Sequence, residues 1–270
     1  MESRNPAFRG NAFGRQAGGY GYGAPTPQQL HEMYNAPSYV PPAPPAVRPM
    51  TIDDVVVRGF LSLVTLVVAA ALSWTLVPTE LALPVLAVAV IAELGIWAFI
   101  TFGQKANAPL VLAFAAVYGV AVGIVSHAYN DLYHGVVFQA VVGTALAFGA
   151  MLAVHSLRIV RVTPKFTKYV IAAGFALVGL MLINLVVQLF GVEEGIGIRD
   201  PGNPLAYVFS VAAILLGCLF LLLDFDSIEQ GVRAGAPEKF AWYCAFGLVL
   251  SLVWIYLELL RFLSYFSGRD

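Results

Sequence analysis

Seven long apolar runs after residue 56 constrain this chain more than any other feature; five are poor in charge and two carry single acids. A helix needs about 20 consecutive apolar residues to cross the hydrocarbon core of a bilayer. Inside that core every backbone N–H must bond within its own segment, which a helix achieves. The sequence therefore predicts an all-α, polytopic membrane protein, a bundle of seven transmembrane helices. The expected spans are residues 57–77, 82–102, 108–128, 135–157, 167–190, 204–225 and 240–264.

Composition supports this interpretation and excludes several function classes. Hydrophobic residues make up 59% of the chain and charged residues 11%, whereas an ordinary soluble domain is about one quarter charged. The chain contains neither a P-loop nor a strand-linked glycine fingerprint for a dinucleotide. No lysine lies deep inside an expected span, which excludes a retinal Schiff base. We expect no cofactor, no enzymatic activity and no nucleic-acid partner.

The distribution of Lys and Arg predicts the orientation of the helices. With seven spans and a cytoplasmic N-terminus, twelve of the fifteen Lys and Arg residues lie on the cytoplasmic side, as the positive-inside rule requires. These twelve are Arg4, Arg9, Arg15, Arg48, Arg58, Lys105, Arg158, Arg161, Lys165, Lys168, Arg233 and Lys239. The other side holds Arg199, Arg261 and Arg269. The alternative is six spans and a re-entrant segment, which would return the C-terminus to the cytoplasm.

Residues 1–50 differ completely from the membrane domain expected over residues 51–270. They contain a Gly/Tyr run at 18–23 and a proline-rich stretch at 40–45. Such a segment buries too little apolar surface to offset its ordering entropy, so we expect a disordered cytoplasmic tail with polyproline II character. It has no signal-peptide layout. The tail is either a docking sequence for a cytoplasmic partner or a solvated leader.

The loops between spans are short, and two of them carry features of interest. Cations gather in the loop between the fourth and fifth spans, at Arg158, Arg161, Lys165 and Lys168. They are expected to anchor both helices at the cytoplasmic face, and a lipid-headgroup site is the alternative. In the loop after the third span, His127, Asp131 and His134 have a spacing that could seat a metal. That loop faces outward, where polar residues need no special reason, so we expect no metal.

Acidic side chains inside apolar spans are the main candidates for function. Glu93 lies in the middle of the second span, Asp224 and Asp226 at the inner end of the sixth, and Glu258 well within the seventh. An ionised side chain at the bilayer centre costs at least about 2.5 kcal/mol on insertion scales, so intramembrane acids usually have a partner or a proton. Two facing carboxylates share a proton and titrate as a unit. Such a pair would sense pH and, fully ionised, would suit a divalent cation.

Local explanations for these acids remain open. Asp224 and Asp226 could simply mark where the sixth helix enters water. Glu258 could pair with Arg261 at i,i+3. Glu93 has no cation within helical reach of its own span.

Two motifs near the end of the chain resemble the Bax inhibitor (YccA-like) family of membrane proteins. In that family the sixth helix ends in a Tyr-Asp-Thr-Gln-like motif, and Phe225-Asp226-Ser227 is similar to it. The seventh helix carries a Leu-Tyr-Leu-Asp-Phe-like motif, and Tyr256-Leu257-Glu258 is similar to it. A further match follows the family's order of glycines, a Gln-Ala pair and spaced arginines, at Gly119, Gly123, Gln139, Ala140, Arg158, Arg161 and Thr163. The resemblance covers about residues 50–267.

The resemblance implies a seven-helix bundle with the last helix central. It also implies a pH-dependent calcium leak, gated in bacterial members by one carboxylate from each of the last two helices. Carried over to this chain, the pH-sensing and gating pair is Asp226 and Glu258, with Asp224 and Glu93 as supporting acids. Other members modulate membrane-bound proteolysis or suppress cell death.

The chain departs from the family pattern in ways that bear on this pair. Glu258 replaces the usual Asp, and Tyr118 stands where many relatives have Glu. The second span lacks the Arg that some members use to hold the pair closed. As straight antiparallel helices, the last two spans place Asp226 near the inner face and Glu258 about 18 residues into the membrane, at different depths. Pairing would require a later start of the last span or a deep cytoplasmic cavity at Asp226.

The sequence therefore predicts a pH-regulated leak for calcium or another cation in the cytoplasmic membrane of a bacterium. Its expected partners are membrane lipid and the transported cation. The alternative is a non-transporting regulator that binds a membrane protease or another membrane protein.

Overall fold

The protein is represented by a computed structural model that describes residues 26–28, 31, 48–103, 105–191, 195–200 and 202–267. Within these ranges seven helices are long and apolar enough to cross a membrane, which confirms the predicted fold class. They are α2 (Ile52–Leu76), α3 (Ala82–Gly103), α4 (Ala108–Leu132), α5 (Val136–Ser156), α6 (Pro164–Leu189), α7 (Pro204–Arg233) and α8 (Phe240–Ser267). A short 3-10 helix, η2 (Thr79–Leu81), precedes α3. The prediction of a disordered tail over residues 1–50 falls mostly outside the described residues.

Side-chain caps explain where several of these helices begin. Thr51 and Asp54 form a reciprocal capping box at the start of α2, which satisfies backbone N–H groups that the helix itself leaves unpaired. Asn107, Thr163 and Asn203 cap α4, α6 and α7, and each is followed by Pro within the first two helical positions. Proline suits that place because its missing N–H is not needed there.

Helix α7 is longer than the sequence predicts. It continues to Arg233, past the expected end at residue 225, so Asp226 lies on the helix and not at its exit. The helix stops where Gly235 takes a positive φ of 64°. The N–H of Ala236 then donates to the carbonyl of Gly231 at 2.9 Å, a closure that glycine favours at a helix C-terminus.

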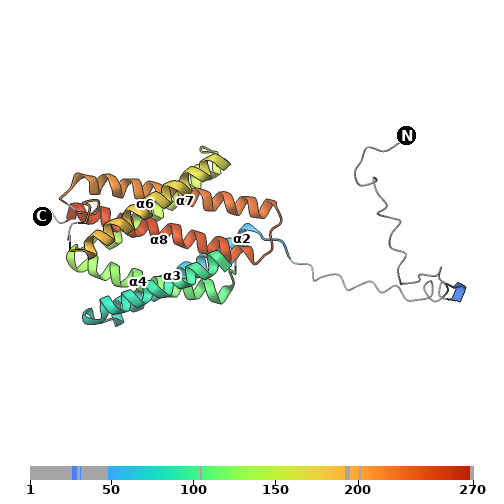
Figure 1. The fold of residues 1–270 in the computed structure, drawn as a ribbon, viewed down its shortest axis with the longest axis horizontal. Coiled ribbons are helices and arrows are strands. Elements are labelled where there is room, and N and C mark those ends of the chain that lie inside the picture. The colour runs from blue at the N-terminus through green and yellow to red at the C-terminus, as the bar shows by residue number, and fades with distance from the viewer. Residues whose placement is uncertain are drawn as a thin grey trace, which may run out of the picture. The chain divides into compact units, whose positions relative to one another are not determined.

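Helix α8 is the centre of the bundle, as the family resemblance implies. Its backbone lies close to those of α2, α4, α5 and α7, whereas within the described residues the backbone of α6 approaches only α7, and that of α3 approaches only α4 and η2. Figure 1 shows α8 running through the middle of the bundle between α7 and α4. A side chain on α8 therefore faces other helices on most sides, which sets the environment of Glu258.

Two glycines let α2 and α4 approach closely. A Cβ atom on Gly119 would overlap the carbonyl oxygen of Leu66, and one on Gly123 would overlap that of Ala70. Small residues at helix interfaces in membranes allow this close backbone approach. Gly179 on α6, by contrast, has no atom near its missing Cβ.

Residues 48–50 are anchored on the loop between α7 and α8. The N–H of Met50 donates to the carbonyl of Ala236 at 2.7 Å, and the N–H of Glu238 donates to the carbonyl of Arg48 at 3.0 Å. Arg48 and Arg58 both form ion pairs with the carboxylate of Glu238. The segment entering the membrane domain is therefore fixed to the start of the central helix.

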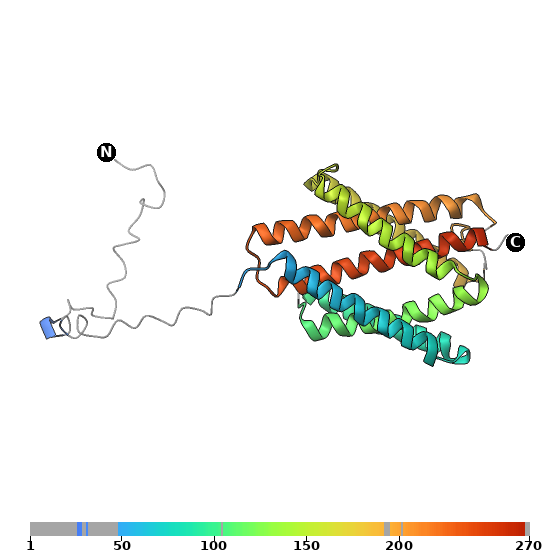
Figure 2. The same ribbon diagram turned by 180° about the vertical axis from the view of Figure 1, so that it is seen from behind.

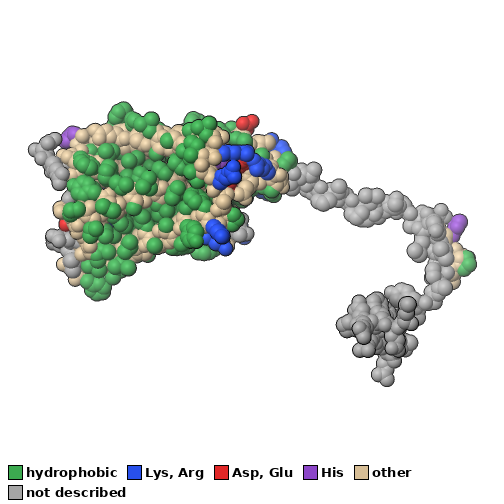
Figure 3. All heavy atoms as spheres, turned by 90° about the horizontal axis from the view of Figure 1, so that it is seen from above, with side chains coloured by type: hydrophobic (Ala, Val, Ile, Leu, Met, Phe, Trp, Pro, Cys, Tyr) green, Lys and Arg blue, Asp and Glu red, His purple; other side chains and the backbone are tan. Residues whose placement is uncertain are grey.

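The described cations are divided unequally between the two ends of the bundle. We call the end at which α2 begins and α5 and α7 finish the basic end, and the other the opposite end. The basic end holds Arg48, Arg58, Lys105, Arg158, Arg161, Lys165, Lys168, Arg233 and Lys239. The opposite end holds Arg199 and Arg261. Figure 3 shows Lys and Arg gathered at one end of a surface that is otherwise mostly hydrophobic.

Candidate functional site

The most deeply buried acid of the described bundle is Glu258 on the central helix. The residue is only 5% exposed. Its Oε1 accepts hydrogen bonds from Arg199 at 3.2 Å and from Arg261 at 3.4 Å. Its Oε2 is buried and has no hydrogen-bond partner among the described residues. Two cations thus offset the charge of this carboxylate. Its other oxygen can still bind a proton, accept a hydrogen bond or coordinate a cation.

Arg199 reaches this site from the loop between α6 and α7. The N–H of Ile196 donates to the side-chain oxygen of Asn184 on α6 at 2.9 Å, which draws the loop onto the bundle. The guanidinium of Arg199 lies 6.0 Å from the centre of the Phe209 ring on α7. Sequence analysis treated Arg199 only as a marker of the outer side. Arg199 is the one cation of the loop between the fifth and sixth predicted spans, and its position in the sequence gave no sign of a buried partner on α8.

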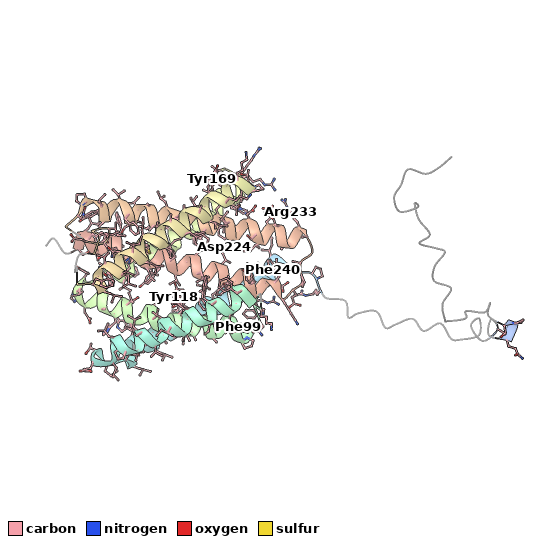
Figure 4. The ribbon with its side chains drawn as sticks, in the orientation of Figure 1. Phe99, Tyr118, Tyr169, Asp224, Arg233 and Phe240 are labelled. Atoms are coloured by element: carbon pink, nitrogen blue, oxygen red, sulfur yellow. The ribbon has the colours of Figure 1, made fainter. Side chains whose placement is uncertain are left out.

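Asp224 is the acid of α7 that meets α8. The hydroxyl of Ser251 on α8 donates to its Oδ2 at 2.5 Å. A Cβ atom on Gly247 would lie 2.9 Å from its Oδ1, so the glycine leaves the room that the carboxylate occupies. In Figure 4 Asp224 lies between the ribbons of α7 and α8, well inside the bundle.

The structure does not bring Asp226 and Glu258 together. Asp226 accepts a hydrogen bond at 2.5 Å from Gln230, one turn further along its own helix. No hydrogen bond or ion pair joins it to Glu258 in the described part of the chain. Ser251, which bonds Asp224, precedes Glu258 by seven residues on α8, or about 10 Å along the axis. The acids of α7 and α8 therefore lie at successive depths, as the straight-helix argument from the sequence suggested.

Glu93 stands apart from the other acids. It is half-buried on α3, whose backbone does not approach α7 or α8 within the described residues. Glu93 is thus an intramembrane acid apart from those of α7 and α8.

The histidines take part in local contacts. His127 lies 3.7 Å from Asp131 and packs against the ring of Trp74, with 5.2 Å between ring centres. His155 lies 3.2 Å from Glu229 near the basic end. Among the described residues no group of three His, Cys, Asp or Glu side chains is arranged to hold a metal ion.

Comparison with known proteins bears on the whole chain. A family model described as Bax inhibitor 1 like matches residues 5–268. The match includes all seven spanning helices and every residue of the acidic site. A search of curated proteins finds no match.

Proposed function

Because this chain belongs to the Bax inhibitor 1 like family, we propose that it is a pH-regulated leak for calcium or another cation. The leak would lie in the cytoplasmic membrane of a bacterium, with the basic end in the cytoplasm in accordance with the positive-inside rule. The observation that carries the proposal is Glu258, a carboxylate inside the bundle whose two oxygens differ in their bonding. One oxygen accepts from Arg199 and Arg261, and the other has no partner among the residues that the structure describes.

Arg199 acts in this proposal as the closing element at the opposite end. Its guanidinium is brought by a loop and held by a single carboxylate oxygen together with an aromatic ring. This ion pair and the hydrogen bond from Ile196 to Asn184 tie the loop to the bundle, and one protonation event breaks the ion pair. While the pair is intact, the positive charge of Arg199 also blocks cations electrostatically.

The direction of the pH response follows from this pair. Ionised Glu258 attracts both Arg199 and Arg261, and it offsets the repulsion between them. A protonated Glu258 loses that attraction, so the two arginines repel one another and the loop is released. Flux should therefore rise as pH falls. This direction is opposite to the one expected from a proton shared between Asp226 and Glu258, which would hold those helices closed in acid.

The remaining acids provide oxygen ligands along the same helices. Asp224 and Ser251 present a carboxylate and a hydroxyl at one level between α7 and α8. Asp226 lies further along α7 toward the basic end. Oxygen ligands of this kind suit hard cations such as calcium, and sites at successive depths allow an ion to enter and leave in steps.

The proposal is tested by calcium flux into dye-loaded proteoliposomes. We compare the native chain with Glu258→Gln, which removes the ionisable group and keeps the shape. The native flux should rise as the pH falls, and the variant should leak at every pH. Glu229→Gln is the matched control, because Glu229 is a surface carboxylate at the basic end, and it should behave like the native chain.

Two results would reject the leak mechanism. A pH response in Glu258→Gln identical to the native response would remove Glu258 as the sensor. Absence of flux from folded native protein at every pH would favour the alternative, a non-transporting regulator of a membrane protein. Deleting residues 1–46 would then test whether that regulation depends on the tail.

A further inference from the structure

A long apolar groove opens between α2 and α5 on the surface of the bundle. The backbones of these two helices do not come together in the described residues, whereas each of them packs on α8. Figure 2 shows α2 and α5 on this side of the bundle, with α8 behind and between them. The groove therefore has two walls and a floor, and its open side faces the membrane.

Two cavities make up the groove and run into one another. The first has a volume of about 690 Å³ and the second about 510 Å³. Both are lined by Leu63 of α2, Phe148 of α5 and Leu252 of α8. Each volume lies within the range of about 300–1,000 Å³ that small-molecule sites in proteins occupy.

The groove extends across the membrane. On α2 its lining runs from Ile52 to Trp74, which is about 33 Å at a rise of about 1.5 Å per residue. The hydrocarbon core of a bilayer is about 30 Å thick. The first cavity covers the half nearest the basic end, from Ile52 to Leu63, or about 17 Å. Its length is that of one leaflet.

The lining indicates an apolar occupant. Apart from residues at its mouth, the first cavity is lined by apolar side chains and Gly59. A void of this size would forfeit dispersion contacts along its walls, and water finds too few polar partners there. Hydrocarbon chains lie beside the open side, so an acyl chain is the occupant that the bilayer supplies.

Within the described groove, charged side chains line only the mouth of the first cavity. It is formed by His155, Arg158 and Glu229. The carboxylate of Glu229 is already shared by His155 at 3.2 Å, by Arg158 at 3.6 Å and by Arg233. Two arginines against one carboxylate leave a net positive charge, and the side chain of Arg158 is 75% exposed. A guanidinium with free N–H groups matches the oxygens of a phosphate.

We propose that the groove between α2 and α5 binds an anionic phospholipid. An acyl chain fills the first cavity, and the headgroup phosphate binds Arg158 at the mouth. The site does not depend on the proposed leak, because no residue of the acidic site lines either cavity.

The proposal is tested by native mass spectrometry of the purified full-length protein in neutral detergent. Phosphatidylglycerol and phosphatidylcholine with identical acyl chains are titrated separately. We expect phosphatidylglycerol to bind the native chain at least about tenfold more tightly, because it carries a net negative charge beside Arg158, whereas the choline cation of phosphatidylcholine offsets the charge of its phosphate. Arg158→Ala should lose this preference, while Arg161→Ala, a neighbouring cation that lines neither cavity, should keep it.

A second pair of variants tests the groove itself. Leu152 lines the first cavity and is 43% exposed, so Leu152→Trp fills the groove without entering the core. It should reduce the binding of both lipids about tenfold, whereas Leu146→Trp should bind both like the native chain, because Leu146 is 69% exposed and lines neither cavity. Val56→Trp, also on the cavity wall and exposed, replaces Leu152→Trp if that variant does not fold.

Three results would overturn the proposal. Equal binding of the two lipids by the native chain would show a non-selective lipid contact. Unchanged binding in Leu152→Trp or Val56→Trp would place the lipid outside the groove. Displacement of phosphatidylglycerol by inorganic phosphate at equal concentration would show that only the headgroup is recognised and that no acyl chain is held.

Discussion

Removing Arg199 should destabilise the folded bundle through its effect on Glu258. The perturbation is Arg199→Met, which keeps the length and apolar stem of the side chain and removes its charge. Removing one member of a buried ion pair costs about 3–5 kcal/mol, because the other charge stays buried and unpaired. Here Glu258 keeps Arg261 at 3.4 Å, and the side chain of Arg199 is 23% exposed. We therefore expect a smaller loss of about 2–3 kcal/mol in the free energy of unfolding.

A double-mutant cycle separates this interaction from other effects of the substitution. Glu258→Gln removes the charge of the carboxylate, and in that background Arg199→Met should cost little. The coupling energy should be about 1–3 kcal/mol, the upper part of the range for residues in direct contact. Reversible unfolding of the purified protein in mixed micelles of increasing denaturing detergent measures each free energy.

Arg233→Met is the control for the loss of an arginine as such. Arg233 pairs with Glu229, and the two side chains are 65% and 36% exposed, so its loss should cost less than about 1 kcal/mol. A coupling energy below about 0.5 kcal/mol between Arg199 and Glu258 would show that the pair does not hold the loop. The gate described above would then have no structural basis.

Three further predictions concern packing and hydrogen bonding in the bundle. Gly123→Ala should destabilise the protein by about 1–3 kcal/mol in the same unfolding assay, because its Cβ would overlap the α2 backbone. Gly149→Ala is the control and should be neutral or stabilising, because no atom lies near its missing Cβ. Equal effects of the two substitutions would contradict the close approach of α2 and α4. Ser251→Ala should cost about 1–3 kcal/mol because it leaves the carboxylate of Asp224 without its donor, and an unchanged stability would refute that bond. Glu238→Gln should speed exchange of the Met50 amide, because it weakens the ion pairs of Arg48 and Arg58 with this carboxylate; protection equal to that of the native chain would show that the backbone bonds suffice.

Hydropathy and charge were sufficient to predict the helices, because crossing hydrocarbon leaves few structural options. The same rules could not define the end of α7. The polar residues after 225 are typical of a segment that has left the membrane, but they remain helical as far as Arg233, and Gly235 follows with a positive φ. Helix caps such as Thr51 depend on chemistry that is local to a few residues, which is the kind of feature that a sequence pattern can indicate. The central place of α8 came from the family resemblance and not from its hydropathy.

Only part of the acidic site could be predicted from the sequence, for two physical reasons. Asp224 and Asp226 are two residues apart, so their side chains point about 200° apart around the helix, and hydropathy does not fix the rotation that decides which one meets α8. The structure turns Asp224 toward Ser251. The second reason is distance along the chain, because Arg199 reaches Glu258 through a loop that folds back. A pattern of nearby residues cannot reveal such a contact.

The release of the α6–α7 loop on protonation of Glu258 can be measured directly by the distance between two spin labels. One label replaces Ile196 in the loop and the other Phe266 near the end of α8, both exposed, in a background without Cys218 and Cys244. At high pH the distance distribution should be narrow, and at low pH, where Glu258 is protonated, it should broaden toward longer distances. In Glu258→Gln it should be broad at both. A narrow distribution that does not change with pH, or one that broadens equally with and without Glu258, would contradict the gate.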